Sequence, residues 1–396
     1  MNNDIIFIGG MDWHGKYKYS THHIVERLSA RRRVFYIDNF GGRRDLRAGD
    51  AARAAQKAIH LLGRGSPRKN AFSQGAANPV IVQPILIPTP RFPGTVGRLN
   101  RFLLSRSFGK IIDRYQIRDP IVWTCLPTDV VWGSIPACQP GVLVYQSVDK
   151  FSEHPLIPAA VRPRFARFEN MFTRSADLVF ANARNLFEEK IKLNSRTYFF
   201  PNGVDPDQFD RHGAAVESLQ ALSKPVIGFA GLLGPWIDFD MLAQCAAERP
   251  GWSFVFIGAV VPGTAVEGLT KLANVHLTGA VDHADLGMHF KYFDAGIIPY
   301  RLSEFTRYTF PSKMAEYLAA GLPVISTALP EVKPYSHVVR IAHNPAEMIA
   351  AIEHALEQGD DSFHKKARIE VARSLSWDTI VGQMVKLIDE TVQDKL

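Results

Sequence analysis

Short apolar runs alternate along this chain with longer segments in which apolar residues recur every three or four positions, a spacing typical of amphipathic helices. Such helical segments include Ser20–Ala30 and Arg162–Arg174. Strands that alternate with helices form parallel sheets of the doubly wound kind, so the fold class is predicted to be α/β. The predicted strands are 4–9, 33–38, 79–87, 120–124, 142–146, 177–181, 225–230, 252–257, 274–278, 294–298 and 322–326.

The alternation runs twice, and the turn-rich segment Pro201-Asn-Gly-Val-Asp-Pro-Asp-Gln208 separates the two series. We therefore predict two Rossmann-like domains, over residues 1–203 and 204–375, followed by a terminal helix within 376–396. A length of 396 residues fits two domains of roughly 100–200 residues each. Apolar residues make up 46% of the chain, which is enough for a large core.

The positive charge is concentrated in one part of the chain. The net charge is +7, yet residues 40–118 alone carry 15 Lys and Arg against 3 Asp and Glu, so the remainder is net negative. Such a segment suggests a polyanionic partner: a phosphate-rich substrate, an anionic membrane surface or nucleic acid. The helical pattern within Arg91–Arg118 fits either a domain helix with snorkelling arginines or a basic amphipathic surface on anionic lipid. Residues 42–78 show no clear pattern, and part of them resembles a mobile loop.

The cysteines and the N-terminus indicate a cytoplasmic protein. Cys125, Cys138 and Cys245 are widely spaced and odd in number, which argues against a disulfide framework. No apolar run approaches the ~20 residues of a membrane span, and Asp4–Gly9 begins a strand rather than a signal peptide. The motifs of zinc hydrolases, serine hydrolases and Walker-type nucleotide-binding proteins do not occur.

The segment Phe310–Ser326 predicts a loop, the start of a short amphipathic helix, a Gly-Leu-Pro turn and a buried strand. A helix N-terminus offers unpaired N–H groups and a partial positive charge, so it binds anions. Lys313 would add a full charge for a phosphate, and Glu316, one turn deeper, would accept hydrogen bonds from a ribose. The alternative is a surface Lys–Glu pair worth only about 0.2–0.5 kcal/mol.

Two glycine-rich turns follow the first strand of each series. Gly228-Phe-Ala-Gly231-Leu-Leu-Gly234 would let the backbone approach a ligand at the carboxyl end of its sheet. The turn over Gly9–Gly15 lacks the dinucleotide-binding spacing and carries Asp12 and Trp13, which suit a sugar or phosphate acceptor better. His22 and His23 follow near the start of the next helix, where histidines are more often structural.

Asp149 directly follows the predicted strand 142–146 in the segment Val148-Asp149-Lys150. A carboxylate at the carboxyl end of a strand that faces a cleft between domains is placed for general-base catalysis. Alternatively, Asp149 caps the segment that follows it.

The chain resembles GT-B nucleotide-sugar glycosyltransferases. The segments that carry the resemblance are 201–205, 228–231, 294–300 and 311–326, and their order and spacing are more specific than any one of them. The resemblance implies two Rossmann-like domains that face each other across a cleft, with the donor on the C-terminal one. It also implies that the helix from Trp377 crosses back onto the N-terminal domain.

The chain is more closely similar to the xanthan-type inverting glucuronosyltransferases, which are membrane-associated, and to related bacterial polysaccharide glycosyltransferases. This similarity implies that Asp149, four residues after Tyr145, is the base. It also implies acceptor and donor contacts. The acceptor residues are Asp12, Trp13 and His22, and the donor residues are Gly231, Gly234, Tyr300, Thr309, Ser312, Lys313 and Glu316, the last of which replaces a glutamine.

One position departs from a common pattern. Retaining GT-B enzymes usually carry a second glutamate eight residues before the ribose-binding one, and here that position holds Tyr308. The departure favours inversion with Asp149 as the base.

Together these features predict a hexosyl-type glycosyltransferase that uses a nucleoside diphosphate sugar and a lipid-linked or polysaccharide acceptor. We expect no cofactor and no metal, because Lys313 and helix dipoles would stabilise the leaving diphosphate. We also expect cytoplasmic localisation, at the inner face of the cytoplasmic membrane if residues 40–118 bind lipid.

The alternatives are a sugar-nucleotide 2-epimerase of the same fold and a non-catalytic partner in glycan assembly. Nucleic-acid binding is disfavoured, because the basic segment lacks the interleaved aromatic residues used for base stacking.

Overall fold

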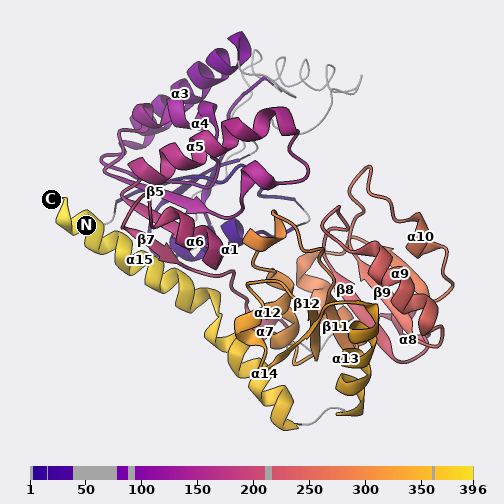
Figure 1. Ribbon diagram of the computed structural model, residues 1–396. Helices are drawn as coiled ribbons and strands as arrows, with labels where there is room; N and C mark the ends of the chain where they lie inside the picture. The colour runs from indigo at the N-terminus through magenta and orange to yellow at the C-terminus, as the bar shows by residue number, and fades with distance from the viewer. Residues whose placement is uncertain are drawn as a thin grey trace.

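The computed structural model describes residues 3–15, 17–38, 78–87, 94–209, 216–358 and 362–395. They form two domains, each a parallel sheet with helices on its faces, and the last long helix runs along the side of the N-terminal domain (Figure 1). The predicted α/β class is confirmed. Most of the segment 42–78 lies outside the described residues, and so does much of the basic segment 40–118.

The N-terminal domain is built on a sheet with strand order β3-β2-β1-β4-β5-β6-β7. The pairings are parallel, and β1 lies between β2 and β4, so the strand order reverses at β1. The predicted strand 79–87 is shortened to three residues, and the short strand β7 has no counterpart in the prediction. The strands are β1 (Ile5–Ile8), β2 (Val34–Ile37), β3 (Val80–Val82), β4 (Ile121–Thr124), β5 (Val142–Ser147), β6 (Leu178–Ala181) and β7 (Thr197–Phe199).

The C-terminal domain repeats the design with strand order β10-β9-β8-β11-β12-β13, again with parallel pairings. Edge strand β13 has no counterpart among the predicted strands, because the exposed edge lets Arg340 interrupt its apolar run. The strands are β8 (Val226–Ala230), β9 (Ser253–Ile257), β10 (Val275–Gly279), β11 (Ala295–Ile298), β12 (Val324–Thr327) and β13 (Val339–Ala342).

The helices cover the faces of the sheets, begin at their carboxyl edges, or form the pair that ends the chain. The helical pattern within 91–118 corresponds to the single helix α3. The α-helices of the N-terminal domain are α1 (Ser20–Ser29), α3 (Thr95–Tyr115), α4 (Asp129–Ser134), α5 (Arg162–Ser175) and α6 (Arg184–Lys190). The later α-helices are α7 (Pro206–Phe209), α8 (Glu217–Gln220), α9 (Phe239–Glu248), α10 (Glu267–Thr270), α11 (Leu286–Phe290), α12 (Ser312–Ala319), α13 (Pro345–Glu357), α14 (Ser362–Ser374) and α15 (Trp377–Asp394).

Helix α15 returns the chain to the N-terminal domain. Its apolar face, which includes Trp377, Ile380 and Met384, is buried in the same core cluster as residues of β1, β4 and β5. Polar contacts fix its outer face, because Arg27 bonds the Asp378 carboxylate at 2.6 Å and Arg32 pairs with Asp389. In Figure 1 the yellow α15 lies along the purple domain, while α14 lies beneath the C-terminal one.

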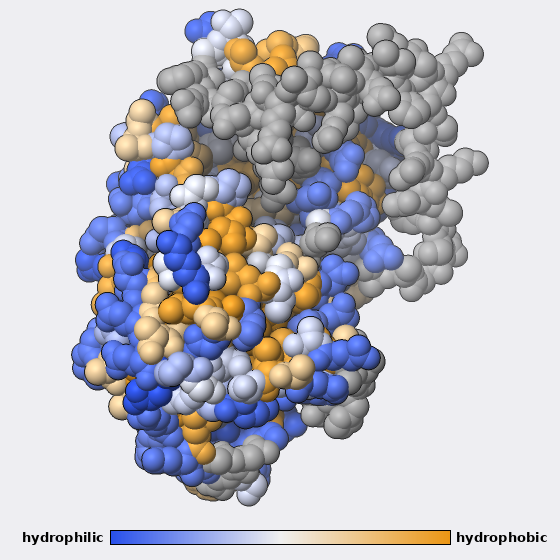
Figure 2. All heavy atoms as spheres, turned by 90° about the vertical axis from the view of Figure 1, so that its right-hand side faces the viewer, coloured by the Kyte–Doolittle hydropathy of each residue, from blue (hydrophilic) through white to orange (hydrophobic). Residues whose placement is uncertain are grey.

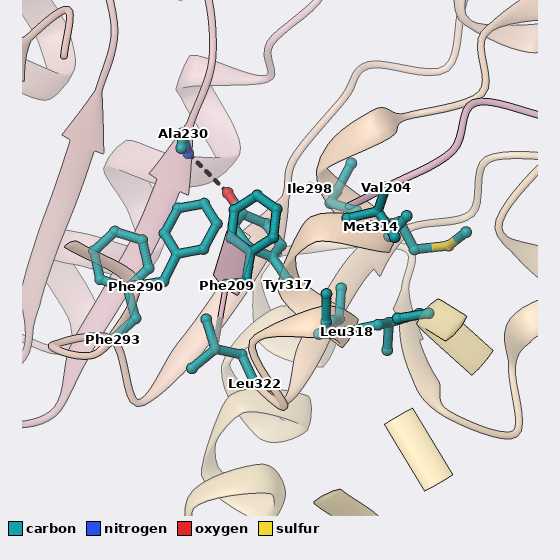
Figure 3. Packing of buried hydrophobic residues seen from close by; sticks show 14 of the residues in the cluster. Val204, Phe209, Ala230, Phe290, Phe293, Ile298, Met314, Tyr317, Leu318 and Leu322 are labelled. Carbon is teal, nitrogen blue, oxygen red and sulfur yellow. Dashed lines mark hydrogen bonds between the residues drawn. The ribbon is translucent and has the colours of Figure 1, made fainter. Parts of the chain in front are cut away.

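Tyr317 anchors α12 to the core of the C-terminal domain (Figure 3). Its ring is fully buried, and its hydroxyl oxygen accepts a 2.7 Å hydrogen bond from the Ala230 N–H at the end of β8. The ring packs edge-on against Phe290, with 5.0 Å between ring centroids. Because an unpaired buried donor is costly, this bond fixes α12 relative to the glycine turn after β8.

The face drawn in Figure 2 carries many hydrophilic residues, and hydrophobic residues gather over its middle. Within the described ranges, every helix is too short or too polar to cross a membrane.

Candidate active site

A cavity of about 250 Å³, the central cavity, lies between the two domains. Loops at the carboxyl ends of β1, β5 and β11 reach it, as does the start of α12, which is where open α/β sheets bind ligands. Its lining combines residues of both domains: Gly9, Met11, Lys18, Tyr19, Ser20, Thr21, His23, Cys125, Leu126, Val148, Asp149, Phe151, Asn182, Asn202, Gly203, His283, Tyr300, Thr309, Phe310, Pro311, Ser312, Lys313, Glu316 and Trp377.

The predicted Lys–Glu pair stands at the edge of this cavity. The Lys313 ammonium lies 2.6 Å from one carboxylate oxygen of Glu316, and His283 Nε2 lies 3.7 Å from the other. Burial raises the pKa of Glu316, but Lys313 and His283 outweigh that effect and lower the pKa to about 2. Glu316 is therefore ionised at neutral pH and can accept hydrogen bonds from a hydroxyl-bearing ligand.

The first turn of α12 faces the same cavity. Pro311 precedes the helix, and no side chain of the described residues caps its N-terminus. The N–H groups of Ser312 and Lys313 therefore remain available to an anion, beside the Lys313 charge. Asn202 donates a 3.0 Å hydrogen bond to the Phe310 carbonyl and so ties the loop before the helix to the segment between the domains.

The two predicted donor glycines have different surroundings. Gly231 has a φ of +152°, and a β-carbon there would lie 4.0 Å from Lys313 Cε. It lines a smaller cavity that adjoins the central one through Lys18, His283 and Lys313. Gly234 instead packs against the ring of Trp236 and is not among the residues that line the central cavity. Its predicted donor contact remains a prediction.

Asp149 lies two residues beyond the end of β5 and lines the central cavity. Burial raises its pKa to about 7, and the nearby charge of Glu169 acts in the same direction. Among the described residues, it has no ion-pair or hydrogen-bond partner, which argues against the alternative that it caps the following segment. Tyr145 is wholly buried against Phe172, so its part in the motif is structural.

The phenol of Tyr300 is close enough to both Glu316 and Asp149 for their charges to affect its pKa. Burial raises the pKa of its phenol, and the carboxylates of Glu316 and Asp149 raise it further. Tyr300 thus interacts electrostatically with Glu316 of its own domain and with Asp149 of the other. It remains a neutral hydrogen-bonding group at physiological pH, as a donor-contacting residue would need to be.

The predicted acceptor residues form a cluster beside the central cavity. Trp13 and His22 line an open cavity of about 380 Å³, which shares Lys18 and His283 with the central one. Their rings stack with 5.0 Å between centroids. The Asp12 carboxylate accepts a 3.1 Å bond from the His14 N–H, which shapes the same loop.

Both ring nitrogens of His22 contact backbone atoms of the segment that leads into α1. Its Nδ1 accepts a 3.1 Å bond from the Tyr19 N–H, and its Nε2 lies 3.2 Å from the Asp12 carbonyl oxygen. Burial lowers the pKa of His22, and these contacts only partly offset that effect. Because both ring nitrogens contact backbone, we expect His22 to position Trp13 rather than to bind an acceptor itself.

His23 lines the central cavity, although the family resemblance implied its neighbour His22. His23 Nδ1 lies 3.0 Å from an Asp205 carboxylate oxygen, and its ring stacks on Trp377 at 5.3 Å. The ring of His283 from the other domain stands 5.6 Å away, edge-on. His23 lies on α1 and His283 follows β10 in the other domain, so they meet through the packing of the domains and not through a spacing in the sequence.

No group of three or more His, Cys, Asp and Glu side chains in the described ranges is arranged to hold a metal ion. The positive charges in the cavity instead come from lysines. The metal independence expected from the sequence remains a prediction.

The overall architecture matches solved structures of the GT-B class over nearly the whole chain. Sucrose-phosphate synthase from Thermosynechococcus elongatus superposes with a TM-score of 0.73 at 16% identity, covering 98% of this chain and 99% of that one. HepE from Anabaena, solved in complex with UDP and glucose, gives a TM-score of 0.63 at 16% identity and covers 97% and 99% of the two chains. The chain has the GT-B fold, and the resemblance stated from the sequence is confirmed.

Two sequence comparisons also match glycosyltransferases. Residues 224–358 match the family described as glycosyl transferases group 1. Over 193 residues the chain is 34% identical to the putative teichuronic acid biosynthesis glycosyltransferase TuaH of Bacillus subtilis strain 168. That match covers 47% of this chain, and the chain spans about half the length of that relative, 49%.

Proposed function

We propose that this protein transfers a sugar from a nucleoside diphosphate sugar to a glycan acceptor, with inversion at the anomeric carbon and without a metal. The observation that carries the proposal is one shared cavity. It joins the Lys313–Glu316 ion pair at a helix start in one domain to the Asp149 carboxyl group, with a pKa of about 7, in the other. The first suits a nucleotide diphosphate, and the second suits an acceptor hydroxyl.

On the donor side, the N–H groups at the start of α12 and the Lys313 ammonium hold the diphosphate. Glu316 accepts hydrogen bonds from the ribose hydroxyls. The small cavity lined by Gly231, Gly258 and Val281 adjoins Lys313, and we propose that it takes the nucleobase. The structure of HepE with UDP and glucose, which has the same fold, supports this choice of donor class.

On the acceptor side, a hydroxyl oxygen attacks the anomeric carbon from the face opposite the diphosphate. Asp149 takes the hydroxyl proton as the new carbon–oxygen bond forms and the bond to the diphosphate breaks. Lys313 and the α12 dipole stabilise the negative charge that develops on the leaving diphosphate, as a metal does in other enzymes. Closure of the two domains around the donor is expected to gate turnover.

The rate should depend on pH through Asp149. A base must be deprotonated to act, and burial raises the pKa of Asp149 to about 7. Activity is therefore expected at alkaline pH and should be lost as the pH falls through about 7, tenfold per unit in kcat/KM. A pH–rate profile from 5 to 9 checks this. An acid limb near pH 4 would mean that the titrating group is an ordinary carboxylate.

Donor binding and transfer can be tested in one experiment. UDP, GDP, dTDP and their sugars are screened by thermal shift, since a ligand at 100 times its Kd stabilises the fold by about 2.7 kcal/mol. The nucleotide sugar that binds is then incubated with and without glycan acceptors. Acceptor-dependent release of the nucleoside diphosphate supports the proposal. A new epimer of the donor without acceptor favours the epimerase alternative, and the absence of any bound nucleotide contradicts both.

The acceptor is proposed to be a growing polysaccharide or its lipid-linked precursor, held at an anionic membrane surface. The relative TuaH is named for teichuronic acid biosynthesis, which supports a polysaccharide.

Exposed residues of α3 support the membrane surface. On α3, Leu99 is 41% exposed and Phe102 is 60% exposed, beside the exposed basic residues Arg98 and Arg106. Ile87, 41% exposed, joins them because Asn100 bonds its backbone N–H and carbonyl at 2.8 Å each. Exposed apolar and basic side chains on one helix suit anionic lipid.

Replacing Leu99 and Phe102 with serine should weaken binding to vesicles rich in phosphatidylglycerol about tenfold or more, because two apolar anchors are lost. Co-sedimentation measures the change. The matched control is Phe363→Ser on α14, where Phe363 is 74% exposed on the other domain. Unchanged binding by the α3 variant would contradict this membrane surface.

A further inference from the structure

Tyr308, at the position where retaining relatives usually carry a glutamate, contacts a carboxylate of the other domain. Its hydroxyl donates a hydrogen bond to one oxygen of Glu189 on α6, and the ammonium of Lys150 pairs with the second oxygen. The same ammonium lies 4.9 Å from the centroid of the Tyr308 ring. These three residues, the domain latch, close a ring of contacts between the domains.

Both ends of the latch adjoin residues of the central cavity. Lys150 directly follows Asp149, and Tyr308 directly precedes Thr309, and both neighbours line the cavity. Because each latch residue is covalently bonded to a cavity residue, a displacement of Lys150 or Tyr308 also displaces its neighbour. The latch therefore sets the position of the loop that carries Asp149 relative to the loop that leads to Lys313.

Further contacts hold α6 against the donor domain. Asn185 Nδ2 donates a 2.7 Å hydrogen bond to the Arg307 carbonyl, and the Arg184 N–H donates a 2.5 Å bond to Glu331. The Tyr308 ring also packs on the small apolar cluster that contains Leu186. The latch is thus the polar part of a continuous contact between α6 and the segment before α12.

The charge on Glu189 suits this role. Burial raises its pKa, but the hydrogen bonds from Lys150 and Tyr308 outweigh that effect and lower the pKa below its usual range. Glu189 is therefore ionised at neutral pH, and hydrogen bonds to an ionised acceptor are roughly twice as strong as neutral ones. The phenol of Tyr308 stays protonated, because burial and Glu189 both raise its pKa.

We propose that Glu189 and Tyr308 are positioning residues that hold the domains closed and set Asp149 against the bound donor. This inference rests on the proposed function, since it assigns a role in that reaction. Neither residue is among those that line the central cavity, so each acts through its neighbours rather than on the substrate. Tyr308 would thus hold the domains in place, a role that does not depend on the mechanism of retaining enzymes.

The test uses Tyr308→Phe, Glu189→Gln and their double variant in the full chain. Each single change should lower kcat about tenfold and leave KM for the donor within about twofold, because donor contacts persist while the base is misplaced. The double variant should be no slower than the slower single variant, since both changes break one unit. Wild-type kcat in the single variants, or losses that multiply in the double variant, would overturn the proposal.

A matched control separates positioning from general stability. Tyr292→Phe removes a phenol that accepts a 3.0 Å bond from the Val216 N–H within the C-terminal domain. It should lower Tm without lowering kcat at temperatures well below Tm. If Tyr292→Phe lowers kcat as much as Tyr308→Phe, the loss reflects stability and the latch has no special role.

A second readout does not depend on catalysis. Spin labels on cysteines that replace the exposed Arg174 and Glu248 report the distance between the domains. In the ligand-free protein, Tyr308→Phe should lengthen or broaden that distance, whereas Tyr292→Phe should not. An unchanged distance would overturn the latch. If the wild type transfers no sugar yet its distance responds to Tyr308→Phe, the proposed function fails while the latch as a closing device stands.

Discussion

The Asp149→Asn variant is expected to bind the donor normally and to transfer sugar about 10²–10⁴ times more slowly than the wild type. Asparagine keeps the size of the side chain but cannot accept the acceptor proton, and a positioned base contributes roughly that factor. The donor contacts lie on the other domain, so the affinity for the nucleotide should change little. Single-turnover kinetics with saturating donor, together with titration of the nucleotide, measure the two effects separately.

The matched control for this variant is Asp177→Asn. Asp177 precedes β6 at the opposite edge of the sheet, where its carboxylate accepts a 2.8 Å bond from the Leu143 N–H. This change should leave kcat within a few-fold of the wild type. Wild-type turnover in Asp149→Asn would show that another group takes the proton, and the His23–Asp205 pair would be the first to examine.

The Lys313→Met variant is expected to lose about 10²–10³ in kcat and to bind the nucleoside diphosphate more weakly. Removing the ammonium takes away a charge that stabilises the leaving diphosphate, and one such group typically contributes that factor. It also leaves the buried Glu316 carboxylate without the cation that chiefly offsets its burial, so its pKa should rise. Calorimetric titration with UDP or GDP and steady-state kinetics measure both losses.

Two further variants separate the causes. In Lys313→Met/Glu316→Gln the unpaired carboxylate is gone, so a loss in kcat beyond that of Glu316→Gln alone belongs to the missing ammonium. Lys224→Met is the matched control, because Lys224 pairs with Asp294 at 3.0 Å in the same domain but does not line the central cavity. If the double variant regains wild-type kcat, Lys313 has only a structural role.

Much of the fold could be predicted from the sequence, since most strands are short, wholly buried apolar runs such as Ile5–Ile8 and Val226–Ala230. The strands that escaped prediction, β7 and β13, lie at sheet edges, where exposure permits polar residues and weakens the pattern. The pair of Lys313 and Glu316 could be predicted because both lie on one helix, and local spacing fixes their relation.

The rest of the site depends on contacts between distant segments. His23 and His283 meet only when the domains pack, and Glu189 reaches Tyr308 across 119 positions of sequence. The sequence places His22 and His23 at the same helix start, but only the structure shows that His23 lines the central cavity while His22 contacts the Asp12 carbonyl. Such relations arise from tertiary packing, which the local spacing of residues does not encode.

The central claim is that Asp149 activates the acceptor for direct displacement of the diphosphate. The anomeric configuration of the product tests this most directly, because a single displacement at the anomeric carbon inverts it. With an α-configured nucleotide sugar as donor, proton NMR of the freshly formed product should show a β-linkage. An α-linkage would contradict the account and assign the chemistry to a mechanism in which Asp149 is not the base.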